Sequence, residues 1–127
     1  MGSDTGVLGL LYKIVLLFVI AGHFFFAYGQ WFKWPKLCDK LTNLNSDEVE
    51  STRFLGRSIA SYNFSIGIGL LLCMVFLNDV AVEAVVLIFI VATAFVGAKG
   101  TNGNSILLLR LAPAAVALLL LTVIRLF

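Results

Sequence analysis

The chain has 127 residues, of which 61% are hydrophobic and only 13% charged, and its formal net charge is +2. A soluble domain has roughly 45–50% apolar and about 25% charged residues, so this composition excludes an ordinary soluble domain. The small net charge gives no reason to expect a nucleic-acid partner. We therefore expect one all-α integral membrane domain over residues 1–127.

Four apolar segments are long enough to cross a bilayer as helices, which takes roughly 20 residues each. They cover about residues 7–32, 55–77, 80–98 and 105–125. The sequence therefore predicts a polytopic four-transmembrane-helix bundle, with a short interfacial helix in the first loop.

One stripe of the first span combines apolar and polar side chains at helical spacings of three and four. Its members are Tyr12, Leu16, Val19, His23, Phe26, Ala27, Gln30 and Trp34. Polar groups in hydrocarbon need partners within the protein, so this stripe should face other helices.

The first loop is the main hydrophilic region. Pro35 suits the first turn of a short interfacial helix that ends near Leu41. Asn45 and Glu48 are spaced as a capping box. They predict a helix that starts near Ser46 and runs without a break into the second span.

The second span contains two stripes of small and polar residues, the combination that close helix packing in membranes uses. One stripe consists of Arg53, Gly56, Ala60, Asn63 and Gly67, and the other of Ser58, Tyr62, Ser65, Gly69 and Cys73. We expect both stripes to pack against other helices.

The remaining spans have clear boundaries. Asn78 and Asp79 predict a tight turn that caps the third helix, and Glu83 in its first turn should serve the helix N-terminus. Residues 99–105 predict a loop. Pro113 lies inside the fourth span and should kink it or free a carbonyl.

Lysine and arginine counts predict the orientation. The first loop, the start of the second span and the third loop hold Lys33, Lys36, Lys40, Arg53, Arg57 and Lys99. The opposite side has only Lys13 and Arg125. By the positive-inside rule, the long first loop is cytoplasmic and both termini lie outside.

Five polar residues from three spans are the candidate ligand-binding residues: His23, Gln30, Tyr62, Asn63 and Arg110. His23 is either a hydrogen-bonded strut or a group that contacts a ligand or takes part in catalysis. Asn63 either joins helices or donates to a carbonyl, epoxide or head group.

Arg110 is the costliest residue to place in a membrane. It either extends to the interface or meets a carboxylate or an anionic ligand, which it could share with Arg57.

The sequence shows no Gly-rich phosphate loop, nucleophile–base pair or carboxylate pair, so no catalytic motif is recognisable. Metal binding is not expected, because there is one histidine and the two cysteines lack metal-ligand spacing. We predict no cofactor. Cys38 in a loop and Cys73 in an apolar run are not expected to form a disulfide.

Several short motifs resemble those of small bacterial membrane proteins classed as domain of unknown function 1304. The stretch from His23 to Trp34 is similar to the family's first-helix pattern, and Tyr62-Asn63 with Gly67 to its second. Gly97-Ala98 and the run from Ile106 to Ala114 are similar to its third and fourth. The resemblance implies four helices in one bundle, and we expect the inner membrane of a bacterium. It implies no activity.

The chain departs from the family pattern at three positions. Gly22 and Gln30 stand where the family often has glutamate, and Arg110 stands where it commonly has glutamine. Proton chemistry resting on those acids is therefore not expected here.

Three functions fit this pattern. The first is a protein whose polar cluster binds a lipid-soluble or lipid-like ligand, or an enzyme that acts on such a ligand. The second is an accessory or assembly subunit, and the third is a small transporter or channel. We expect membrane lipid as a partner, and a homo-oligomer or larger membrane complex stays open. A closed polar pocket would favour the first function, and an exposed polar stripe the second.

Overall fold

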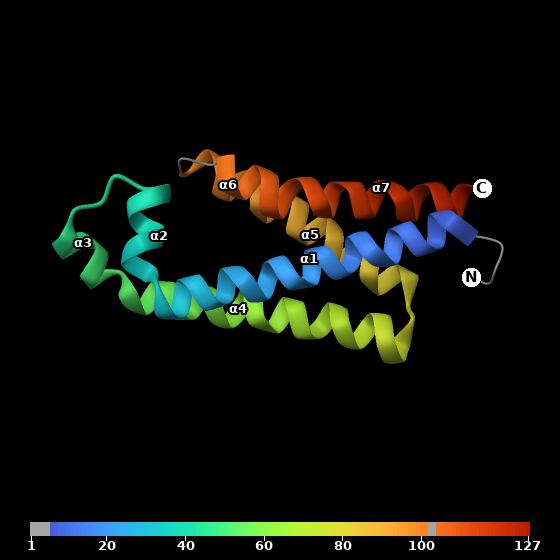
Figure 1. The fold of residues 1–127 in the computed structure, drawn as a ribbon, viewed down its shortest axis with the longest axis horizontal. Helices are drawn as coiled ribbons and strands as arrows, with labels where there is room; N and C mark the ends of the chain where they lie inside the picture. The colour runs from blue at the N-terminus through green and yellow to red at the C-terminus, as the bar shows by residue number, and fades with distance from the viewer. Residues whose placement is uncertain (1–5, 102–103) are drawn as a thin grey trace.

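The computed structural model describes residues 6–101 and 104–127, and within these ranges every regular element is helical. Figure 1 shows their arrangement. In chain order the elements are α1 (Gly6–Phe32), α2 (Trp34–Leu41), α3 (Ser46–Ser51), α4 (Arg53–Leu72), the π-helix η2 (Cys73–Leu77), α5 (Val80–Lys99), α6 (Asn104–Ile106), the π-helix η3 (Leu107–Leu111) and α7 (Ala112–Leu126).

Four helical segments are long and apolar enough to cross a membrane. They are Gly6–Phe32, Arg53–Leu77, Val80–Lys99 and Leu107–Leu126. These segments match the four predicted spans, and the protein is therefore an integral membrane protein with an all-α fold.

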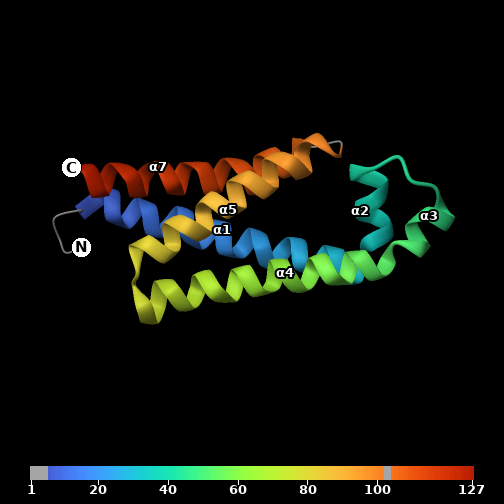
Figure 2. The ribbon, with the colours of Figure 1, turned by 180° about the vertical axis from the view of Figure 1, so that it is seen from behind.

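The long helices form two antiparallel pairs. Helix α1 packs against α4 and also against α7, which in turn packs against α5. Helices α4 and α5 lie close at the turn that joins them and then diverge, as the front and back views show (Figure 1, Figure 2). Helix α1 therefore connects the two pairs.

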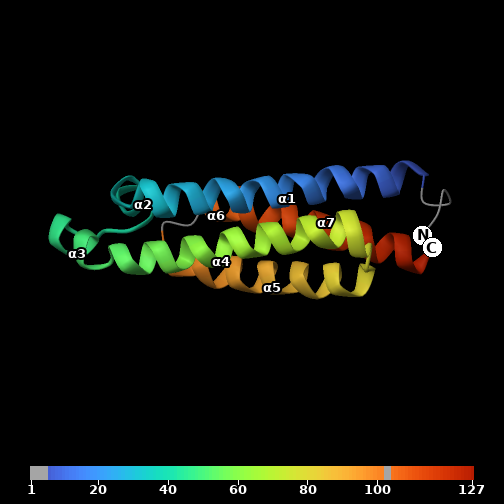
Figure 3. The ribbon, with the colours of Figure 1, turned by 90° about the horizontal axis from the view of Figure 1, so that it is seen from below.

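The two ends of the bundle differ. The start of α1 and the end of α7 lie at one end, while α2 and α3 lie at the other (Figure 3). The lysine and arginine residues of the first loop therefore lie at the end opposite to the start of α1 and the end of α7. Residues 102 and 103 of the predicted third loop lie outside the described residues.

Helix α4 approaches α1 and the first residue of α2 closely through glycine. A Cβ atom on Gly56 would lie 2.5 Å from the ring of Trp34, and one on Gly67 would lie 2.9 Å from the ring of Phe24. Four members of the first predicted stripe, Gly56, Ala60, Asn63 and Gly67, are buried, so this face packs inside the bundle as predicted. Its fifth member, Arg53, is only partly buried and pairs instead with Glu50 of the first loop at 3.0 Å.

The second predicted stripe of α4 was placed wrongly. Ser58, Tyr62, Ser65 and Gly69 are exposed on the outer face of α4, and only Cys73 is buried. The reason is that α4 has one extensive neighbour, α1, so only one of its faces can be covered.

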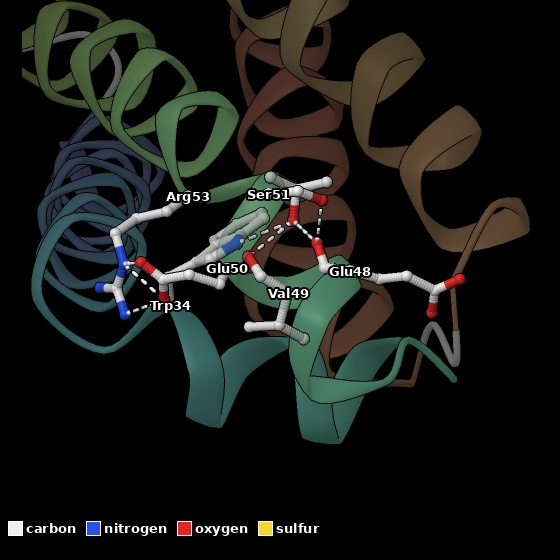
Figure 4. A network of polar contacts seen from close by, with 7 residues as sticks. Trp34, Glu48, Val49, Glu50, Ser51 and Arg53 are labelled. Atoms are coloured by element: carbon white, nitrogen blue, oxygen red, sulfur yellow. Dashed lines mark hydrogen bonds and ion pairs between the residues drawn. The ribbon is translucent and has the colours of Figure 1, made fainter.

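The first loop folds as predicted except at one residue. Asn45 and Glu48 form the capping box, with N···O distances of 2.8 and 2.9 Å. Contrary to the prediction, the helix that begins at Ser46 does not run unbroken into α4. It ends at Ser51, and Thr52 separates it from α4. The Thr52 hydroxyl lies 2.9 Å from the Glu48 carbonyl and 3.2 Å from Nε1 of Trp34, which donates to it (Figure 4).

The turn after η2 also follows the prediction. Asn78 adopts a left-handed conformation with φ of 49°. The Asp79 carboxylate then caps α5 by accepting from the backbone nitrogens of Ala81 and Val82, at 3.0 and 3.2 Å.

Pro113 explains the irregular start of the fourth span. Proline has no N–H to donate to the carbonyl four residues earlier, that of Leu109. The π-helix η3 ends just before it. A Cβ atom on Gly22 of α1 would lie only 3.3 Å from the Leu109 oxygen, so this carbonyl lies against a glycine of α1.

Candidate functional site

His23 lies on the buried face of α1 with 2% of its surface exposed. Its Nδ1 atom is 2.9 Å from the carbonyl oxygen of Val19. A carbonyl can only accept, so Nδ1 carries the proton, and in a neutral imidazole Nε2 is then a bare acceptor. Among the residues whose side chains the structure describes, this buried Nε2 has no partner.

Arg110 is half-buried in η3. One terminal nitrogen, Nη2, donates to the hydroxyl oxygen of Thr93 on α5 at 3.3 Å. The hydroxyl of Thr93 bonds back to its own helix, at 2.9 Å from the Phe89 carbonyl. The Nε atom of Arg110 is buried and has no hydrogen-bond partner within the described ranges.

The two unpaired nitrogens come from adjoining segments. Gly22 directly precedes His23, and Leu109 directly precedes Arg110. Gly22 and Leu109 lie against each other. Helix α1 also packs against η3. The interior between α1 and η3 therefore offers one acceptor and one donor that the described side chains leave unpaired.

Gln30 and Asn63 form a separate pair. Nδ2 of Asn63, which is 2% exposed, donates to Oε1 of Gln30 at 2.7 Å. This bond joins α4 to α1. No hydrogen bond in the described part of the chain connects this pair to His23 or Arg110.

Tyr62 does not join the other candidates. It lies on the outer face of α4 with 71% of its surface exposed, where the prediction had placed it in the interior. The Arg57 guanidinium lies over the ring of Trp31, 5.5 Å from its centroid, whereas Arg110 bonds to Thr93. The structure gives no support to an anionic group shared by the two arginines.

A cavity of about 590 Å³ lies between α1, α2 and η3, and its lining does not include His23 or Arg110. Its lining includes Phe26, one helical turn after His23, and Leu109, the neighbour of Arg110. Helix α2 forms another wall. Among the described residues, the lining consists of Phe25, Phe26, Tyr28, Gly29, Lys33, Lys36, Leu37, Asp39, Lys40, Leu41 and Leu109. The cavity is thus largely apolar, with charged side chains from the first loop.

A second groove, of about 410 Å³, lies between α1 and α4. Aromatic residues dominate its lining, among them Phe24, Trp31 and Phe64. Ser61 of α4 also lines this groove, but its hydroxyl already donates to the Arg57 carbonyl at 3.1 Å. The cavity beside Leu109 is the better candidate of the two, because it is lined by both α1 and η3, the segments that carry the two unpaired nitrogens.

Sequence reasoning missed a buried pair at the other end of the bundle. The Tyr12 hydroxyl donates to Oε2 of Glu83 at 2.6 Å, and Glu83 is only 3% exposed. The spacing of Glu83 from the buried Leu87 and Ile90 was a usable signal, because these residues share one helical stripe.

The described residues contain no group of three or more His, Cys, Asp or Glu side chains placed to hold a metal ion.

The fold and the site define a class: an integral membrane protein of four helices with a small polar interior near one end. A comparison with family models then identifies the family. The model described as protein of unknown function (DUF1304) matches residues 17–122, and the chain belongs to this family. No curated protein and no solved structure matches the chain.

Proposed function

We propose that this protein binds a lipid-soluble molecule whose polar group reaches His23 and Arg110. The observation that carries the proposal is the pair of buried atoms, Nε2 of His23 and Nε of Arg110, without partners among the described side chains. A buried polar atom without a partner costs about 1–3 kcal/mol. A bound polar group would remove this cost.

The adjoining cavity supports the proposal by its size and lining. Ligand pockets typically measure roughly 300–1,000 Å³ and are mostly apolar with few polar groups. The cavity of about 590 Å³ falls in this range. Phe25, Phe26, Leu37 and Leu109 would contact the apolar body of the ligand.

Helix α2 gives the cavity its place at the membrane surface. Its apolar residues Leu37 and Leu41 line the cavity, while Lys36 and Lys40 are also exposed. Lysines at such positions bury their stems and keep their charges among water and head groups. A ligand could therefore enter from the head-group layer beside α2.

Native mass spectrometry with solvent extraction tests the proposal. The protein would be purified in a mild detergent, and the mass of the intact complex compared with the mass of the chain. We expect one retained small molecule per chain, released into the organic extract. Bare protein under conditions that keep the fold intact would contradict the proposal.

A second function has its own supporting observation. The exposed hydroxyls of Ser58, Tyr62 and Ser65 lie on the outer face of α4, where the lipid chains offer no hydrogen bonds. A partner helix would cover them, as an accessory or assembly subunit requires. The same mass spectra would report a second copy or a larger complex.

For the orientation we propose that α2 and α3 lie on the cytoplasmic side of a bacterial inner membrane. The positive-inside rule supports this choice, since six of eight lysine and arginine residues near the spans are at that end.

A further inference from the structure

We infer that the polar group of the ligand is a hydroxyl, which donates to Nε2 of His23 and accepts from Nε of Arg110. This inference rests on the proposed binding function and specifies the chemical class of the ligand: an apolar alcohol.

The first step is the proton on His23. Nδ1 donates to the Val19 carbonyl at 2.9 Å, so the neutral ring presents only a lone pair at Nε2. A second proton would place a charge on this buried ring in an apolar interior, so the ring stays neutral. The ligand must therefore supply a hydrogen-bond donor to His23.

The second step is the proton on Arg110. A guanidinium has no acceptor and keeps its proton, so its Nε–H can only donate. Nη2 of the same side chain is already bonded to Thr93. The ligand must therefore supply an acceptor to Nε.

A hydroxyl meets both requirements with one oxygen atom. An ether or ketone accepts from Arg110 but leaves Nε2 of His23 unpaired. A carboxylate also lacks a hydrogen, so it would have to bring a second positive charge onto His23 within an apolar interior. A hydroxyl requires no change of charge.

Three probes with one alkyl chain separate these cases: dodecanol, dodecyl methyl ether and dodecanoate. Each would be titrated into the full chain in phosphatidylcholine nanodiscs. The chain has a single histidine, so ¹⁵N-histidine labelling reports on His23 alone. The ¹⁵N shift of Nε2 distinguishes a free lone pair, a hydrogen-bonded lone pair and a protonated nitrogen.

We expect dodecanol to bind at least about tenfold more tightly than the ether, the factor that corresponds to about one hydrogen bond. It should move Nε2 from the free to the hydrogen-bonded shift, without protonation. Arg110→Lys should weaken dodecanol binding about tenfold, because lysine has no Nε–H at that position. Arg125→Gln, at the other end of the bundle, should leave binding unchanged.

The failures are distinguishable. Equal binding of ether and alcohol would overturn the inference while ligand binding stands. Tightest binding of dodecanoate with a protonated His23 would do the same. An Nε2 that is already hydrogen-bonded and unmoved by any probe would mean that water alone occupies the site, which overturns the inference. If no probe binds, both the inference and the proposed function are contradicted.

Discussion

Asn63 of α4 donates a hydrogen bond of 2.7 Å to Gln30 of α1 and thereby ties the two most extensively packed helices together. Asn63→Leu would leave the Gln30 oxygen without its donor in an apolar interior. We expect the free energy of unfolding to fall by about 0.5–2 kcal/mol, the range of intramembrane hydrogen bonds. Unfolding in mixed micelles would measure it.

Tyr62→Phe is the matched control for this change, because Tyr62 is the exposed neighbour of Asn63. It should change the free energy of unfolding by less than about 0.5 kcal/mol. A neutral Asn63→Leu, or an equal loss in the control, would mean that the Gln30–Asn63 bond does not stabilise the bundle.

Gly56 and Gly69 give a second matched comparison. A Cβ atom on Gly56 would lie 2.5 Å from the Trp34 ring, whereas one on Gly69 would meet nothing within 4 Å. Gly56→Ala should destabilise by about 1–3 kcal/mol through overpacking. Gly69→Ala should be neutral or stabilising by up to about 1 kcal/mol, because alanine favours helix more than glycine does. Thermal unfolding of both variants checks the order, and the reverse order would refute the packing of α4 against Trp34 at the start of α2.

The Tyr12–Glu83 hydrogen bond should be more sensitive to loss of its donor than to a change of its acceptor. Tyr12→Phe removes the donor to a buried carboxylate and should cost about 1–3 kcal/mol. Glu83→Gln keeps an oxygen that can accept from Tyr12, so its cost should be smaller. Tyr28→Phe, at an exposed tyrosine of the same helix, should be nearly silent. Similar losses in all three variants would contradict a specific role of the bond.

Cysteine labelling tests the orientation. Both native cysteines are buried, and burial raises the pKa of the Cys38 thiol, so neither should react with a maleimide that cannot cross the membrane. Ser46→Cys in α3 should be labelled only from the cytoplasmic side, and Phe127→Cys only from outside. Labelling from the opposite sides would reverse the proposed topology.

The sequence predicted much of the fold, because hydrocarbon imposes strict rules on span length and polar placement. The four spans, the capping box at Asn45 and the turn at Asn78 all follow from local residues. The break at Thr52 did not, because it depends partly on a bond from Trp34, 18 residues away.

The site was predicted less completely. Asn63 and His23 were correctly placed in the interior, since their helical stripes also contain small or apolar residues. Tyr62 was misplaced because a stripe of small and polar residues shows that a face can pack, but not that a neighbour is present. The pairing of Tyr12 with Glu83 required the tertiary arrangement of α1 and α5, which local patterns do not specify.

The central claim is that Arg110 and His23 hold the polar group of a bound molecule, and retention by Arg110 variants tests it most directly. Native mass spectrometry would compare the retained ligand in wild type, Arg110→Lys, Arg110→Gln and the control Arg125→Gln. We predict loss of the ligand in both Arg110 variants and full retention in the control, since lysine keeps the charge but lacks Nε–H. Equal retention in all four proteins would contradict the claim.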